Sequence, residues 1–149
     1  MDYLKKFQDM IDEYNAGSYN IEEFFKKLTA FAQALDEEEK RGIAEQLTEE
    51  ELALFDLLTK PDPELTEKQQ MEVKKVARTL LETLKREKLV LDWRKRQQSR
   101  AAVKLAIDDI LDGLPEEPYP RPVYAKKCDA VYRHFYDSYY GENRSVYVN

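Results

Sequence analysis

The sequence predicts an all-α protein: a helical bundle of about five to seven helices, arranged in one or two lobes. Residues that favour helices, namely Leu, Glu, Lys, Ala and Gln, fill most segments of the 149 residues, which include only four Gly and six Pro. Apolar residues recur at the helical spacing of about 3.6 residues in successive segments. No segment shows the alternating pattern that predicts a β-strand.

The first helix is expected at the N-terminus and the second after a turn at residues 15–20. The apolar stripe of the first helix comprises Tyr3, Leu4, Phe7, Met10, Ile11 and Tyr14. Asn20, with Glu23 three residues later, predicts the start of the second helix, as in a capping box. The apolar face of that helix comprises Ile21, Phe24, Phe25, Leu28, Phe31, Ala32 and Leu35.

Two further helices complete an expected N-terminal helical lobe, residues 1–60. A short polar helix is predicted over residues 36–46. Thr48 with Glu51 predicts a second capping box, which begins a helix through Leu58.

The segment KPDPE, residues 60–64, interrupts the helical pattern, because two prolines so close together do not fit inside a helix. We therefore expect residues 61–65 to form a hinge between the N-terminal lobe and a C-terminal helical lobe, residues 66–149. Thr66 opens the most regular helix of the chain, with apolar residues at Val73, Val76, Ala77, Leu80, Leu81 and Leu84.

Two more helices are predicted in the C-terminal lobe. One runs from about Asp92 to Asp112, with Gly113 placed to end it. The segment PEEPYPRP, residues 115–122, predicts a stiff, extended connection. The last helix is expected from about Val123 to Tyr140, stopping at Gly141.

Cysteine content and hydropathy restrict the class of protein. The single Cys128 excludes an internal disulfide, and one Cys with one His cannot form a Cys₄ or Cys₂His₂ zinc site. The longest apolar run, Leu52–Phe55, is far shorter than the about 18 residues that a membrane span needs. The first residues lack the apolar core of a signal peptide. We expect a soluble, cytoplasmic protein with no membrane partner.

The charge is unevenly distributed along the chain. The formal net charge is −6, which is not the footprint of a nucleic-acid-binding protein. Residues 36–72 hold thirteen acidic and four basic side chains, a balance of −9. Residues 85–104 hold eight basic and two acidic side chains, a balance of +6.

No pattern in the sequence predicts catalysis. Pro61-Asp62 followed by Glu72-Val73-Lys74 matches the written pattern of a PD-(D/E)xK nuclease. In a helix, however, residues two apart diverge by about 200°, so Glu72 and Lys74 would not share a metal site. His134 and Ser138 lie one helical turn apart, but nothing nearby predicts an oxyanion hole. We expect no catalytic residue, no metal ligand and no cofactor site.

The stretch LDWRKRQQSR, residues 91–100, and the tyrosines near the C-terminus predict a docking surface for a protein partner. An aromatic anchor together with Arg and Gln is typical of protein interfaces. The candidate docking residues are Trp93, Arg94, Arg96, Gln97, Gln98, Arg100, Tyr136, Tyr139 and Tyr140.

Other interpretations of these residues remain open. The cations could bind DNA phosphates, and the glutamines could reach bases. The tyrosines could stack on bases, although aromatic residues at helical spacing more often form a packing face. The Arg94–Arg100 segment could instead pair with the acidic residues 37–51 of the same chain.

Three segments carry a family resemblance: LTEEELALFDLLTKPDPELT, VKKVARTLLETLKREKLVLDWRKRQQSRAAVKLAI and YAKKCDAVYRHFYDSYYG. They resemble the C-terminal region of the R (restriction) subunit of type I restriction–modification enzymes. The resemblance is specific from about Thr48 to Tyr147 and continues more weakly through IDEYNAGSYNIEEFFKKL, so it covers nearly the whole chain.

The resemblance implies that the chain is the last helical part of a large subunit. In that family a PD-(D/E)xK nuclease and an ATP-dependent DNA translocase precede the helical part, and the parent enzyme uses ATP and Mg²⁺. No catalytic residue carries over to this chain. This end of the subunit is associated in the family with docking onto the methyltransferase core of M and S subunits. The resemblance therefore implies a non-catalytic assembly module, or alternatively a DNA-contacting module that uses residues 85–104.

Overall fold

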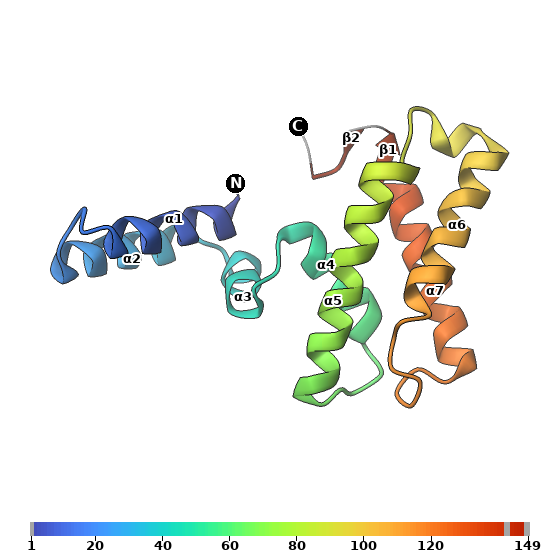
Figure 1. The fold of residues 1–149 in the computed structure, drawn as a ribbon, viewed down its shortest axis with the longest axis horizontal. Coiled ribbons are helices and arrows are strands. Elements are labelled where there is room, and N and C mark those ends of the chain that lie inside the picture. The colour runs from blue at the N-terminus through green and yellow to red at the C-terminus, as the bar shows by residue number, and fades with distance from the viewer. Residues whose placement is uncertain (1, 142–143, 148–149) are drawn as a thin grey trace. The chain divides into compact units, whose positions relative to one another are not determined.

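The computed structural model describes residues 2–141 and 144–147 and confirms an all-α fold (Figure 1). Its described residues contain seven α-helices, two short irregular helices and one small pair of strands. The chain divides into two compact units, Met1–Leu52 and Ala53–Asn149, so the boundary lies inside helix α4, Glu49–Thr59. Residues 61–65, the expected hinge, belong to the second unit, and whether they bend stays a prediction.

The first unit contains helices α1, Tyr3–Asn15, α2, Ile21–Ala34, and α3, Glu37–Glu45. Each begins at a side chain that accepts a hydrogen bond from a free backbone N–H of the first turn: Asp2, Asn20 and Asp36. Asp36 and Glu39 form a complete capping box, which the sequence analysis did not identify. Thr48 and Glu51 form the predicted box at the start of α4.

Helices α1 and α2 pack as a hairpin through aromatic side chains. Phe7 stacks on Phe31, and Tyr14 stacks on Phe24, with ring centroids 6.2 and 4.5 Å apart. The predicted apolar face of α2 is only partly covered, because Ile21 and Phe25 remain exposed and no residue of α2 is fully buried.

Tyr3 forms the centre of the small core of the first unit. It is 4% exposed, and its hydroxyl donates a 2.7 Å hydrogen bond to the backbone carbonyl of Leu47, which is also buried. Its ring lies against Gly42 of α3, where a Cβ atom would overlap the Tyr3 hydroxyl and ring. Gly42 is therefore required for close approach between α1 and α3.

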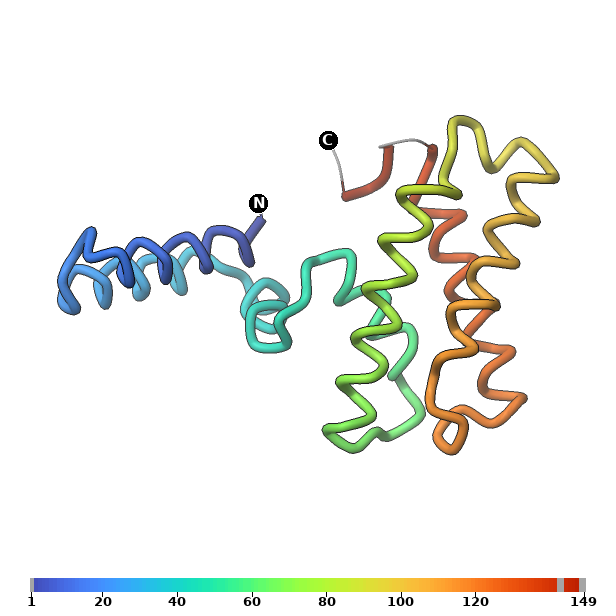
Figure 2. Tube along the Cα trace, in the orientation of Figure 1, coloured from blue at the N-terminus to red at the C-terminus, as the bar shows by residue number. Residues whose placement is uncertain are grey.

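The second unit is built on helices α5, Glu67–Thr83, α6, Gln97–Leu111, and α7, Arg121–Ser138 (Figures 1 and 2). Helix α6 packs on both α5 and α7. The predicted stripe of α5 is confirmed, with Val73, Ala77, Leu80 and Leu84 fully buried. The largest fully buried side chains of this unit are Trp93, Phe135, Leu54, Leu58, Leu80, Leu84, Ile107 and Leu111.

The helix predicted from about Asp92 to Asp112 begins later than expected. Helix α5 continues into a π-helical turn, Leu84–Lys88, and a 3₁₀ turn, Trp93–Lys95, precedes α6. Asp92 has a left-handed backbone with φ of 57°, and Arg96 is extended. Asp is among the few residues that adopt this conformation readily, so the chain turns here without Gly or Pro.

The connection at residues 115–122 turns back on itself instead of extending. The backbone N–H of Tyr119 donates to the carbonyl of Glu116, which closes a turn. Tyr119 is buried, and its hydroxyl donates a 2.7 Å hydrogen bond to the carbonyl of Leu58. Helix α7 then begins at Arg121, two residues earlier than predicted, with a proline in its first turn.

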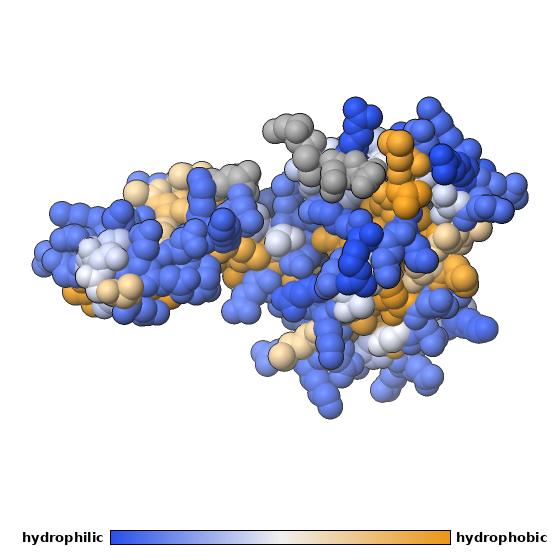
Figure 3. Space-filling view, turned by 45° about the horizontal axis from the view of Figure 1, so that its top comes forward, coloured by the Kyte–Doolittle hydropathy of each residue, from blue (hydrophilic) through white to orange (hydrophobic). Residues whose placement is uncertain are grey.

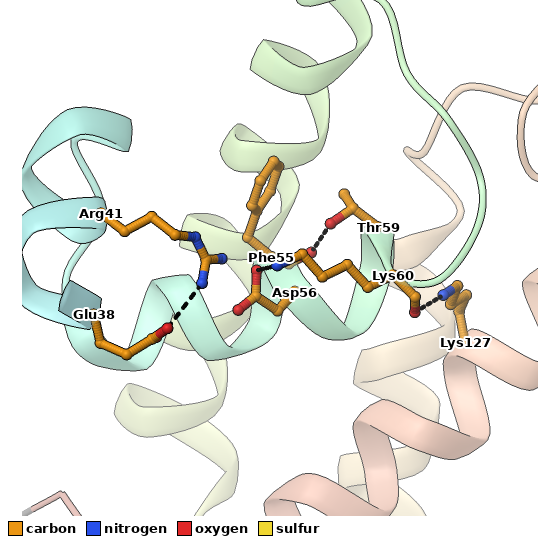
Figure 4. A network of polar contacts seen from close by, with 7 residues as sticks. All are labelled: Glu38, Arg41, Phe55, Asp56, Thr59, Lys60 and Lys127. Atoms are coloured by element: carbon orange, nitrogen blue, oxygen red, sulfur yellow. Dashed lines mark hydrogen bonds and ion pairs between the residues drawn. The ribbon is translucent and has the colours of Figure 1, made fainter.

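Lys127 of α7 holds the C-terminal end of α4 in the second unit (Figure 4). Its ammonium donates to the backbone carbonyls of Leu57 and Lys60, at 2.9 and 3.0 Å. Carbonyls in the last turn of a helix have no partner within the helix, so a buried cation is well suited to bind them. This contact attaches residue 60, which adjoins the expected hinge, to the second unit.

The last helix ends at Ser138, and two short strands follow, which the sequence did not predict. Strand β1, Tyr139–Gly141, pairs antiparallel with β2, Arg144–Ser145. Tyr139 and Gly141 point inward on β1, whereas Tyr140 is exposed. A strand of three residues is too short for alternation to be visible in a sequence.

Two buried tyrosines make the stability of both units sensitive to alkaline pH. Burial raises the pKa of Tyr119 to about 12 and, with nearby carboxylates, that of Tyr3 to about 12, from 10.0. A raised pKa in the folded state stabilises the protein below pH 10, and this contribution is lost as pH rises from 10 to 12. The expected loss for Tyr119 is at most about 3 kcal/mol.

The variant Tyr119→Phe isolates this effect. At pH 8 it should unfold more easily than the wild type by about 1 kcal/mol, because one buried hydrogen bond is lost. At pH 11.5 the difference should vanish or reverse, because only the wild type must keep a phenol protonated at position 119. Urea unfolding at pH 8 and at pH 11.5 measures the difference in stability between the two proteins. If that difference were the same at both pH values, the pKa of Tyr119 would not be raised by burial.

Candidate docking surface

Trp93 anchors the stretch that the sequence singled out, and it does so inside the second unit. Its side chain is 0% exposed, and its indole N–H donates a 3.0 Å hydrogen bond to the carbonyl of Tyr139. The indole also meets the rings of Tyr132 and Tyr136 edge-to-face, with centroids 6.3 and 6.0 Å apart. Trp93 therefore joins the turn before α6 to the end of α7.

Arg94 extends this anchor toward the surface. Its guanidinium donates a 2.9 Å hydrogen bond to the carbonyl of Tyr136. It also lies over the rings of Tyr136 and Tyr140, 5.5 and 5.1 Å from their centroids. Arg100 donates a 2.7 Å hydrogen bond to the carbonyl of Arg94. These contacts fix the turn from both sides.

The structure separates the nine candidate docking residues into three groups. Trp93 and Tyr139 are buried, which removes them from any docking surface. Arg94 and Arg100 are half-buried and bound to carbonyls of their own unit. The remaining five side chains are exposed, and we call this candidate site the docking surface: Arg96, Gln97, Gln98, Tyr136 and Tyr140.

Exposed apolar residues that the sequence did not single out lie beside the docking surface. Val90 and Leu91 are exposed by 42 and 56%, and the backbone at Val90 and Asp92 lies close to Gly141 of β1. Lys95 is also exposed, with its ammonium 4.0 Å from the carboxylate of Asp92. Figure 3 shows that hydrophobic side chains reach the surface of the second unit among hydrophilic ones. The apolar run LVL, residues 89–91, was the sequence signal that could have predicted these exposed apolar residues.

The residues weighed for catalysis, Glu72, Lys74 and His134, lie in helices α5 and α7. Glu72 and Lys74 lie in α5, as expected, and the Lys74 ammonium lies over the ring of Phe55, 5.7 Å from its centroid. The ring of His134 packs among the rings of Phe135, Tyr139 and Tyr147. In residues 2–141 and 144–147, no three His, Cys, Asp or Glu side chains are grouped as a metal ion requires.

The fold and this surface define a class of protein: an all-α module in which the turn before α6 is held to the end of α7. A family model described as type I restriction enzyme HindI endonuclease subunit-like, C-terminal, matches residues 1–136. The chain belongs to this family, the C-terminal region of a type I restriction enzyme subunit.

The other comparisons found no relatives. No curated protein and no solved structure matches the chain. In the part of the chain that the structure describes, no helix is both long enough and apolar enough to cross a bilayer.

Proposed function

We propose that the chain is a non-catalytic assembly module that docks the DNA-translocating endonuclease onto the methyltransferase core of its restriction enzyme. The family to which the chain belongs supports a type I restriction enzyme as the parent enzyme. One observation supports the docking role most strongly. Contacts of Trp93, Arg94 and Arg100 hold the turn before α6 in place, and the polar side chains next to this turn are exposed. A surface that is already ordered loses little conformational entropy when a partner binds.

The docking surface suits a protein better than single-stranded nucleic acid. Base stacking requires free aromatic faces. Arg94 lies over the rings of Tyr136 and Tyr140, and the ammonium of Lys104 lies over the ring of Tyr132, 4.8 Å from its centroid. The exposed apolar residues Val90 and Leu91 would gain nothing from contact with phosphates but would be covered by a protein.

The variant Arg96→Glu in the complete subunit tests this proposal. Arg96 is exposed, and an acidic residue just before α6 suits the N-terminal end of a helix, so folding should be preserved. We expect the affinity for the purified methyltransferase core to fall by about tenfold or more, measured by calorimetry. Lys75→Glu is the matched control, because it makes the same charge change at an exposed position of α5.

The outcomes separate the two candidate partners. If both variants weakened binding of the methyltransferase core equally, or if neither weakened it, docking through this surface would be contradicted. If Arg96→Glu left binding to the methyltransferase intact but lowered affinity for duplex DNA in a strongly salt-dependent manner, residues 85–104 would be a DNA contact instead.

A further inference from the structure

A groove runs between helices α6 and α7 beside the docking surface. The two helices are antiparallel, because Lys104 of α6 meets Tyr132 of α7 whereas Asp108, further along α6, accepts a 2.8 Å hydrogen bond from Tyr124. The groove has a volume of about 910 Å³. Tyr136 belongs both to the groove and to the docking surface, so the two are continuous.

The groove exposes apolar side chains. Leu105 is 62% exposed, although Val103, Ala106 and Ile107 on either side of it along α6 are buried. Tyr132 and Cys128 line the opposite wall, and both are half-buried. A leucine this exposed at the edge of a groove is typical of a surface that a partner covers.

The rim on α7 carries a regular charge pattern. Asp129, Arg133 and Asp137 follow one another at intervals of one helical turn, and all three are exposed. Among residues 2–141 and 144–147, none of the three forms an ion pair or a hydrogen bond through its side chain. This acidic–basic–acidic order is therefore available to a partner.

We propose that the groove receives an amphipathic α-helix of the methyltransferase core, with apolar residues against Leu105 and a basic–acidic–basic series facing α7. This inference rests on the proposed function and names the chemistry of the partner. A helix matches the pattern because its own side chains repeat at the same one-turn interval as Asp129, Arg133 and Asp137. Opposite charges along such a seam fix the register and select the partner.

The length of the bound helix follows from the rim. Asp137 lies eight positions after Asp129, which is a rise of about 12 Å, so a helix of about three turns can face all three charges. On α6, Lys104 and Asp108 also line the groove, and their side chains contact Tyr132 and Tyr124 of α7. A helix in this groove would pack against both α6 and α7, as in a three-helix bundle.

Cys128 provides the test, because its thiol lines the groove and its peptide can be followed separately. In the complete subunit, the rate at which N-ethylmaleimide modifies Cys128 is followed by mass spectrometry of its peptide. Saturating methyltransferase core should slow this rate by about tenfold or more. A benzophenone maleimide attached to Cys128 should crosslink to a methyltransferase segment that carries basic, acidic and basic residues at four-residue intervals.

A variant links the charge pattern to binding. Arg133→Glu should weaken binding of the core by about tenfold, whereas Lys75→Glu should not. If the core binds normally while Cys128 reacts at an unchanged rate, the groove inference is overturned and the proposed function stands. If the core does not bind at all, both are overturned. If Cys128 is already shielded in the subunit alone, another segment of the subunit fills the groove, which also overturns the inference.

Discussion

Trp93→Ala is expected to lower the free energy of unfolding of the second unit by about 3–5 kcal/mol. The indole is completely buried, so its removal leaves a large cavity, and the carbonyl of Tyr139 loses its hydrogen-bond donor. Loss of packing against Tyr132 and Tyr136 also removes the support on which Arg94 rests. The docking surface should become disordered before the remaining helices unfold.

Urea unfolding followed by far-ultraviolet circular dichroism measures this effect without depending on tryptophan fluorescence. Leu91→Ala is the matched control, because Leu91 lies two residues away but is 56% exposed. It should change stability by less than about 0.5 kcal/mol. A Trp93→Ala protein that unfolds at the same urea concentration as the control would show that the indole does not anchor the turn.

Helix identity was predictable where one physical signal dominated. The stripe of α5 is uninterrupted and Thr66 begins it with a capping box, so periodicity and cap agree. The residues after α5 were not predictable in the same way, because the turn depends on Asp92 adopting a left-handed backbone. Asp adopts this conformation more readily than most residues, but most Asp residues do not adopt it, so an Asp alone does not predict a turn. Because residues 94–100 are polar without a Gly or Pro, the sequence predicted one continuous helix through them.

The candidate site was predicted as a region but not residue by residue. Composition identified residues 91–100 and the terminal tyrosines, and the structure brings both together through Trp93 and Arg94. Whether Tyr139 or Tyr140 would be buried depended on the extended backbone of β1, in which successive side chains point to opposite faces. A slip of one residue in such a strand exchanges the buried and exposed faces, and no sequence pattern specified it.

Lys127→Met is expected to lower the free energy of unfolding by about 2–4 kcal/mol. Lys127 is 8% exposed and binds two carbonyls at the end of α4, those of Leu57 and Lys60. Figure 4 shows the contact with Lys60. Methionine preserves most of the packing volume but leaves both carbonyls without this donor. The same burial that makes the two bonds strong also disfavours the cation, because desolvation lowers the pKa of Lys127 and Asp62 only partly opposes it.

The neighbouring lysine decides between these opposing effects. Lys126→Met makes the identical chemical change one residue earlier, where the side chain is exposed, and should leave stability within about 0.5 kcal/mol of the wild type. If Lys127→Met were as stable as Lys126→Met, desolvation of the ammonium would outweigh its two hydrogen bonds. The end of α4 would then be held by apolar packing and by the Tyr119 hydroxyl on Leu58, and Lys127 would have no part in attaching residue 60 to the second unit.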